Sequence, residues 1–314
     1  MDTIIWIVVA VAVLWGFAPI TLGRGGRVST TQLATLCAAV GLPLPDASTG
    51  PILARIAHRE RWSLWGGAIG LALGALTAIV GRLEPGGAVI MLGVAFGGAV
   101  GGGLATVVAG HRVPAGAPRV ARSRRTAVGD YVPVRHLIAA RGMLAVAIVA
   151  GGVELILGAT RTASDVPALL IVCVVVALPV AVLTEVVLRL VADRPQHAST
   201  SLELAWDDVL RADAAHQLVL NQVIVCALAA FAAPFSAGLF DGIGPSPVPP
   251  SGATVVVAVV VLAAAAVAVG LVTTGPWRRH PLDRLWAGRS FDPPGDDSSA
   301  TRPIGASDAG RAPC

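Results

Sequence analysis

The sequence predicts an all-α membrane protein, a polytopic transmembrane helix bundle with seven spans. Hydrophobic residues make up 55% of its 314 residues and charged residues only 13%, with a mean hydropathy of +0.75. A soluble domain carries about 25% charged residues. The apolar residues also gather in long uncharged blocks rather than in amphipathic stripes, and such blocks are typical of helices that cross a bilayer.

A membrane-crossing helix needs about 20 mostly apolar residues, and seven segments meet this requirement. They are 4–22, 63–81, 87–109, 142–160, 166–188, 217–239 and 252–274. Only Asp2 and Thr3 precede the first segment, so it lacks the positive start of a cleavable signal peptide and is expected to remain as an anchor. The membrane domain is then 1–275, followed by a tail at 276–314.

The arginines predict the orientation of this bundle. All 23 basic residues are arginines, and all but Arg82 and Arg161 fall in the segments 23–62, 110–141 and 189–216 or in the tail. Cytoplasmic loops carry the excess of positive charge in membrane proteins. We therefore expect the N-terminus outside and the C-terminus in the cytoplasm, which requires an odd number of spans.

Parts of the cytoplasmic segments are predicted to be helical. Pro51 follows Ser48-Thr49-Gly50 as the first turn of a helix that would continue into the second span. Thr200 and Glu203 have the spacing of a capping box, which predicts a helix running through Trp206 into the sixth span. The tail, rich in Asp, Ser, Gly and Pro, is expected to be mostly disordered.

Small residues at intervals of four mark one face of the second and third predicted spans. They are Gly66, Gly70, Gly74 and Ala78 in one span, and Gly93, Gly97, Gly101 and Ala105 in the other. Such stripes let two helix backbones approach closely in lipid. They predict contact between the two spans, although packing on another span or a second subunit, or a glycine-rich composition without meaning, are alternatives.

Glu154 is the most informative polar residue, since it falls inside the fourth predicted span. It lies about 9 Å below the outer boundary if the helix rises 1.5 Å per residue. An ionisable group at this depth indicates either a functional site or a hydrogen-bonded carboxyl that ties two helices together. A proton or substrate pathway through Glu154 is the functional interpretation.

Three further polar residues lie near the inner boundary. Glu185 precedes Arg189 by four residues, a favourable spacing for an ion pair on one helix face. Asn221 and Gln222 lie at a similar depth in the sixth predicted span, and hydrogen bonding between helices is their expected role.

Motifs of catalysis and cofactor binding are absent from the sequence. The histidines lack metal-site spacing, the cysteines lack a C-x-x-C pattern, and there is no phosphate-binding G-x-x-x-x-G-K-[ST] loop. Without lysine, a retinal Schiff base is excluded. We expect no catalytic residues, no cofactor and no resident metal.

A basic cluster in the second cytoplasmic segment consists of Arg119, Arg122, Arg124 and Arg125. Each arginine near anionic lipid headgroups contributes about 1 kcal/mol to membrane binding. The acidic segment 203–213 is an alternative partner for the cluster. The expected partners of the chain are membrane lipid and a cytoplasmic or membrane protein, and the net charge of +4 is explained by topology rather than by nucleic acid binding.

Four short motifs resemble those of multi-pass hypothetical membrane proteins of actinobacteria. These motifs are Leu42-Pro43-Leu44-Pro45, Arg59-Glu60-Arg61, Asp130-Tyr131-Val132-Pro133 and Asp207-Asp208-Val209-Leu210-Arg211. The resemblance implies a location in the bacterial plasma membrane and implies no activity.

Two classes of function fit these observations. The first is a non-enzymatic accessory or scaffolding protein that presents its cytoplasmic helices to a partner. The second is a transporter of a small solute or lipid that uses Glu154. The scarcity of polar residues within the predicted spans favours the first.

Overall fold

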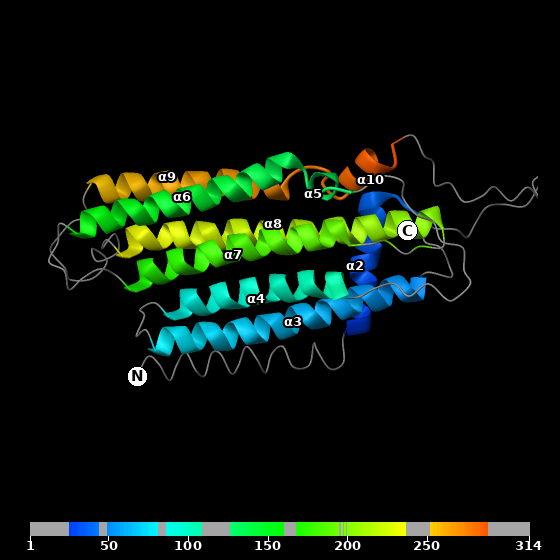
Figure 1. Cartoon of the computed structure of the whole chain (residues 1–314), viewed down its shortest axis with the longest axis horizontal. Helices are drawn as coiled ribbons and strands as arrows, with labels where there is room; N and C mark the ends of the chain where they lie inside the picture. Colours follow the sequence, from blue (N-terminus) through cyan, green and yellow to red (C-terminus); the bar gives the residue numbers. More distant parts are fainter. Residues whose placement is uncertain are drawn as a thin grey trace, which may run out of the picture.

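The computed structural model describes residues 25–43, 49–80, 86–108, 126–159, 168–194, 196, 198, 200–236 and 252–287. These residues form helices and no β-strand, which confirms the all-α class for them. Six long helices lie side by side (Figure 1): α3 (Thr49–Val80), α4 (Gly86–Val108), α6 (Val134–Ala159), α7 (Ala168–Asp193), α8 (Ser201–Ser236) and α9 (Gly252–Thr273). The shorter α2 (Gly25–Val40), α5 (Val128–Tyr131) and α10 (His280–Leu285) gather at one end of them (Figure 1).

Three helices within the described residues are long and apolar enough to cross a membrane. The stretches are Val134–Val153 in α6, Ser201–Phe231 in α8 and Val255–Thr273 in α9. They are fewer than the seven spans expected from the sequence. The predicted spans 63–81, 87–109 and 166–188 fall on α3, α4 and α7, whereas 4–22 lies outside the described residues. Seven spans therefore stay a prediction.

Two of the long helices begin well before their apolar halves. Helix α3 starts at Thr49 with Pro51 in its first turn, where a missing N–H costs no helical hydrogen bond. At the start of α8 the Thr200 hydroxyl accepts a hydrogen bond from the Glu203 backbone N–H at 3.1 Å. Each helix continues without a break into its apolar half, so one continuous helix contains both the charged and the apolar segment.

The glycine stripes lie at the contact between α3 and α4. A Cβ atom at Gly70 would overlap the Gly93 carbonyl and lie 3.2 Å from the Cα atom of Gly97. A Cβ atom at Gly66 would overlap the carbonyl of Gly97 and lie 3.1 Å from the Cα atom of Gly101. The backbones of the two helices therefore touch, and only a residue without a side chain fits at these points.

Gly74 and Ala105 continue the same stripes. A Cβ atom at Gly93 would lie 3.4 Å from the Cα atom of Gly74, and Ala105 is buried. The side chain of Ala78 lies outside the described residues. The contact thus extends along most of the length of α4.

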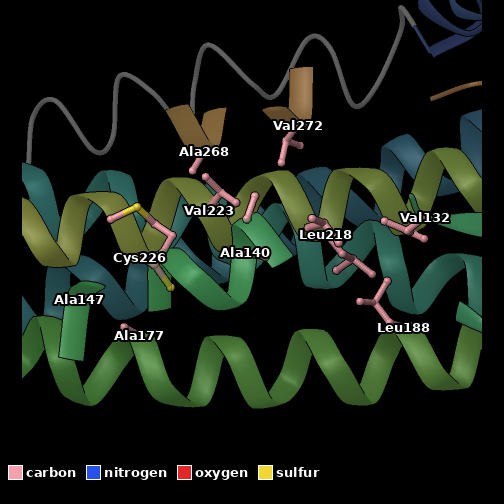
Figure 2. Packing of buried hydrophobic residues seen from close by; sticks show 14 of the residues in the cluster. Val132, Ala140, Ala147, Ala177, Leu188, Leu218, Val223, Cys226, Ala268 and Val272 are labelled. Atoms are coloured by element: carbon pink, nitrogen blue, oxygen red, sulfur yellow. The ribbon is translucent and has the colours of Figure 1, made fainter. Parts of the chain in front are cut away.

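Helix α8 is the centre of the bundle and contacts α4, α6, α7 and α9. Its residues Leu218, Val223 and Cys226 pack against small residues of the neighbouring helices, such as Ala147 and Ala268 (Figure 2). Small and β-branched side chains dominate this core, so the helices approach each other closely, and Tyr131 is a buried aromatic residue within it.

The outward faces of the surrounding helices are apolar. Ile69 on α3, Ile138 on α6 and Val259 on α9 are large apolar side chains that are mostly exposed, and many neighbours on these helices resemble them. A soluble monomer rarely exposes a contiguous apolar surface of this extent. The bundle surface is suited to contact with lipid.

A second group of elements closes one end of the bundle, and we call it the cap. The cap consists of residues 25–43, 49–62, 126–136, 194–216 and 275–287. It has its own hydrophobic core, in which Leu36 and Cys37 of α2, Ile56 of α3 and Trp206 of α8 are buried with Trp286.

Helix α2 was not expected from the sequence, although Leu33, Leu36, Cys37 and Val40 have the spacing of one buried helix face. The helix ends at Gly41, whose φ of 73° suits glycine and whose N–H bonds to the Cys37 carbonyl at 2.8 Å. The tail expected to be mostly disordered begins as α10, while 288–314 lie outside the described residues.

Candidate functional site

A fully buried carboxylate, that of Asp208, lies at the centre of the cap. It accepts hydrogen bonds from the Tyr131 hydroxyl at 3.2 Å, the Gln196 amide at 2.5 Å and the Trp286 indole nitrogen at 2.8 Å. These donors come from α5, from the segment after α7 and from the residue after α10. One charged group of α8 therefore holds together three segments that are far apart in the sequence.

Ion pairs connect the first half of α3 to the first half of α8. Arg55 lies 2.8 Å from Asp207, and Arg59 lies 2.5 Å from Asp213. The Arg211 side chain, only 4% exposed, contacts Asp207 at 2.9 Å within its own helix. It also donates to the carbonyl oxygens of Val191 and Arg194, and so fixes the end of α7 against α8.

These charged residues surround a small, partly open cleft of about 40 Å³ at the junction between bundle and cap, which we call the arginine cleft. Its lining consists of Arg55, Ile56, Arg59, Ala105, Thr106, Arg194, Asp207, Leu210 and Arg211. Four of these nine residues are arginines, and Asp207 is the one carboxylate among them. The lining therefore combines an excess of positive charge with an apolar wall.

Arg194 differs from the other arginines of the cleft. Its guanidinium donates to the Thr106 carbonyl oxygen at the end of α4, and this partner is not a carboxylate. Burial, followed by the charge of Arg211, lowers the pKa of Arg194 from its usual value, while Asp207 acts in the opposite direction. Arginine remains charged in proteins, so the cleft holds closely spaced positive charges at neutral pH.

Three aromatic rings packed against one another form a second polar feature at the cap end of the bundle. The His216 ring lies on the Trp277 ring at 3.6 Å between centroids, and His136 packs beside His216 at 5.4 Å. The Arg278 guanidinium lies over the Trp277 ring, with its Cζ atom 5.0 Å from the ring centroid. His136 and His216 are 80 positions apart on separate helices, so their sequence spacing gave no signal of this contact.

The residues predicted near the inner boundary lie in the second half of α7 and near the middle of α8. Glu185 pairs with Arg189 at 3.3 Å, and Arg141 of α6 joins them at 3.2 Å. Asn221 is half-buried and Gln222 is buried on α8. The predicted inner-rim pair is thus part of a three-residue group that also links α6 to α7.

Two sets of predicted residues cannot be placed at the site. Glu154 belongs to α6, but its side chain lies outside the described residues. Arg119, Arg122, Arg124 and Arg125 lie outside them altogether. The acidic segment 203–213 is paired by arginines, but those shown are Arg55 and Arg59 of α3 together with Arg211 of α8 itself.

The spacing of charged residues in the sequence predicted part of this site. Arg55 and Arg59, and likewise Asp207 and Arg211, are four residues apart and so lie on one face of their helices. This spacing did not predict which residues pair between the two helices, because Arg55 and Asp207 are 152 positions apart and Arg59 and Asp213 are 154 positions apart. Three of the four short motifs described above supply residues to the cap network, and Trp206 donates to the carbonyl oxygen of Pro43 in the fourth.

Among the described residues, no group of three or more His, Cys, Asp or Glu side chains could hold a metal ion. Comparison with protein-family models, with curated proteins and with solved structures found no match for this chain. The geometry of the cap is therefore the basis for any functional assignment. Its charged groups hold separate helices and segments together.

Proposed function

We propose that this chain is a multi-pass protein of the bacterial plasma membrane, and that it is a non-enzymatic accessory or scaffolding component. It has seven spans, with the N-terminus outside and the C-terminus in the cytoplasm. The cap lies in the cytoplasm and is the part that meets a protein partner, while the bundle anchors the cap in the membrane.

One observation carries this proposal: polar and charged groups are concentrated in the cap, whereas the described core of the bundle is apolar apart from a few residues such as Thr184 and Gln222. Asp207 and Asp213 belong to the cap together with their arginine partners, and so does Asp208 with its Trp286 donor. The bundle core beside α8 consists of residues such as Ala147, Val223 and Ala268. A transport pathway needs polar groups from several helices at one depth, and a scaffold does not.

The distribution of arginines supports the orientation. Every arginine among the described residues lies in the cap or within about two helical turns of it. The exposed apolar faces of α3, α6 and α9 supply the surface that lipid would cover. Under the positive-inside rule, the cap is cytoplasmic.

Site-specific photocrosslinking in the producing bacterium tests the scaffold role. A photoreactive amino acid is placed at Ala38, Ala54 or Ala287, which are exposed in the cap, and in matched variants at Val256 or Val259 on the apolar face of α9. The proposal expects a discrete protein adduct of the same identity from more than one cap position and from neither α9 position. Adducts from α9 alone, or none from any cap position, would contradict it.

A further inference from the structure

The arginine cleft brings four guanidinium groups together from three separate segments. Arg55 and Arg59 come from α3, Arg194 follows the end of α7, and Arg211 comes from α8. Arg55 and Arg211 are more than a hundred positions apart in the sequence, so it is the fold that brings these groups together. The guanidinium groups meet at one cleft instead of being spread over a solvated surface.

The carboxylates nearby leave part of this positive charge without an acidic partner. Asp207 is shared, with one oxygen on Arg55 and the other on Arg211. Asp213 contacts Arg59. The described partner of the Arg194 side chain is the Thr106 carbonyl oxygen. In the ion pairs of the described residues, the arginines of the cleft thus contact two carboxylates, those of Asp207 and Asp213.

The chemistry of the lining selects the class of ligand. A guanidinium presents planar, forked donors that match the oxygens of a phosphate group, and bonds between charged partners are stronger than neutral ones. The space inside the cleft is about 40 Å³, enough for about three water-sized groups such as the oxygens of a phosphate. The apolar wall formed by Ile56, Ala105 and Leu210 would accommodate the carbon part of such a ligand.

The position of the cleft bears on the source of the phosphate group. Thr106 lies near the end of α4, and Arg194 immediately follows the end of α7. Both helices coincide with predicted spans, so the cleft lies at the level where anionic headgroups of the cytoplasmic leaflet would be found.

We propose that the arginine cleft is a binding site for a phosphate-bearing ligand, either the headgroup of an anionic phospholipid or a free phosphorylated solute. Arg194, whose described partner is the Thr106 carbonyl oxygen, supplies one positive charge, and Arg55 and Arg59 supply further donors from α3. The site is independent of the scaffold role, because it requires only the geometry of the cleft.

Binding is measured by calorimetry on the full chain in a neutral detergent at fixed ionic strength. The probes are dioctanoyl phosphatidic acid, inorganic phosphate and, as the control without phosphate, dioctanoylglycerol. We expect saturable binding of at least one phosphate probe and none of dioctanoylglycerol. Binding of phosphatidic acid alone identifies a lipid site, and binding of inorganic phosphate identifies a site that a free solute can fill. Failure of both phosphate probes would overturn the proposal.

Arg194→Gln removes the charge but keeps an amide that can donate to Thr106. A lost charge-assisted hydrogen bond of about 1.5–3 kcal/mol corresponds to binding weaker by about tenfold or more. The matched control is Arg189→Gln, an exposed arginine outside the cleft, which should change binding by less than about twofold. Equal loss in both variants would show general charge attraction and contradict the site.

A second pair of variants leaves every arginine in place. Thr106→Glu adds a carboxylate beside the arginines of the cleft, and Thr106→Gln is nearly the same size without the charge. Circular dichroism melting establishes that both variants fold. We expect Thr106→Glu to lose binding by about tenfold or more relative to Thr106→Gln. Equal binding by the two would overturn the assignment of the phosphate to this cleft.

Discussion

The Asp208 carboxylate accepts a hydrogen bond from the Trp286 indole nitrogen at 2.8 Å, although the two residues are 78 positions apart. Both side chains are buried. The bond joins α8, the central helix of the bundle, to the segment that follows the last described helix. It therefore connects the segment after α10 to the cap core.

Trp286→Phe keeps the ring but removes the donor from a buried carboxylate. The free energy of unfolding should fall by about 1–3 kcal/mol, since Asp208 loses one of its partners. Chemical denaturation of the full chain in detergent, followed by circular dichroism, measures this change. The control is Trp65→Phe, because Trp65 is 63% exposed, and it should stay within about 0.5 kcal/mol of the parent. Equal effects of the two substitutions would contradict a structural role for this bond.

The close contact between α3 and α4 predicts that alanine lowers stability at a glycine in the contact but not at a glycine outside it. Gly70→Ala should destabilise the protein by about 1–3 kcal/mol, because the new methyl group would overlap the backbone of α4. Gly152→Ala on α6 should be neutral or stabilising by up to about 1 kcal/mol, since a Cβ atom there meets nothing within 4 Å. Melting temperatures in one detergent compare the two variants. Destabilisation by Gly152→Ala and not by Gly70→Ala would refute the contact.

The ion pair between Arg59 and Asp213 should show measurable coupling. A double-mutant cycle with alanine at both positions isolates the interaction, and a partly buried pair between two helices should give about 0.5–3 kcal/mol. The exposed pair of Glu185 and Arg189 is the control, with an expected coupling of about 0–1 kcal/mol. A coupling near zero for Arg59 and Asp213 would mean that this contact does not fix α3 to α8.

Much of the helical part of the fold follows from the distribution of apolar residues. The predicted spans 87–109 and 252–274 differ from α4 and α9 by at most one residue at each end, because uncharged blocks bounded by glycine, proline or arginine have sharp limits. The start of α6 was less predictable. This helix begins at Val134, eight residues before the expected span, since a helix that leaves the apolar block can continue through Arg135 and Arg141 at little cost.

Contacts within the cap depend on distances that a single sequence does not contain. The spacing of Gly66, Gly70, Gly93 and Gly97 indicated a helix contact because a short connection limited the choice of partner. Asp208 gave no such signal, since its partners Tyr131, Gln196 and Trp286 lie in three different segments. Helix α2 was missed because the apolar face formed by Leu33, Leu36, Cys37 and Val40 is much shorter than the roughly 20 apolar residues of a span.

Substitutions of Glu154 distinguish a scaffolding function from a transport function. The two assays are melting in detergent and rescue of a deletion strain. If the carboxyl only ties helices together, Glu154→Gln should preserve stability and full rescue, because the amide keeps most of the hydrogen bonding. Glu154→Leu should then cost about 1–2 kcal/mol. Loss of rescue by a normally folded Glu154→Gln protein would favour proton or solute transport and would count against the scaffold.

The central claim is that an apolar bundle anchors a cytoplasmic cap, and membrane topology tests it most directly. Reporter domains are inserted into the full-length chain at Gly86, Thr162 and Gly244, and at Ala115 and Ser298 in separate variants. Seven spans with the N-terminus outside predict that the first three positions are extracellular and the last two cytoplasmic. An extracellular reading at both Ala115 and Ser298 would place the cap outside the cell and contradict the account.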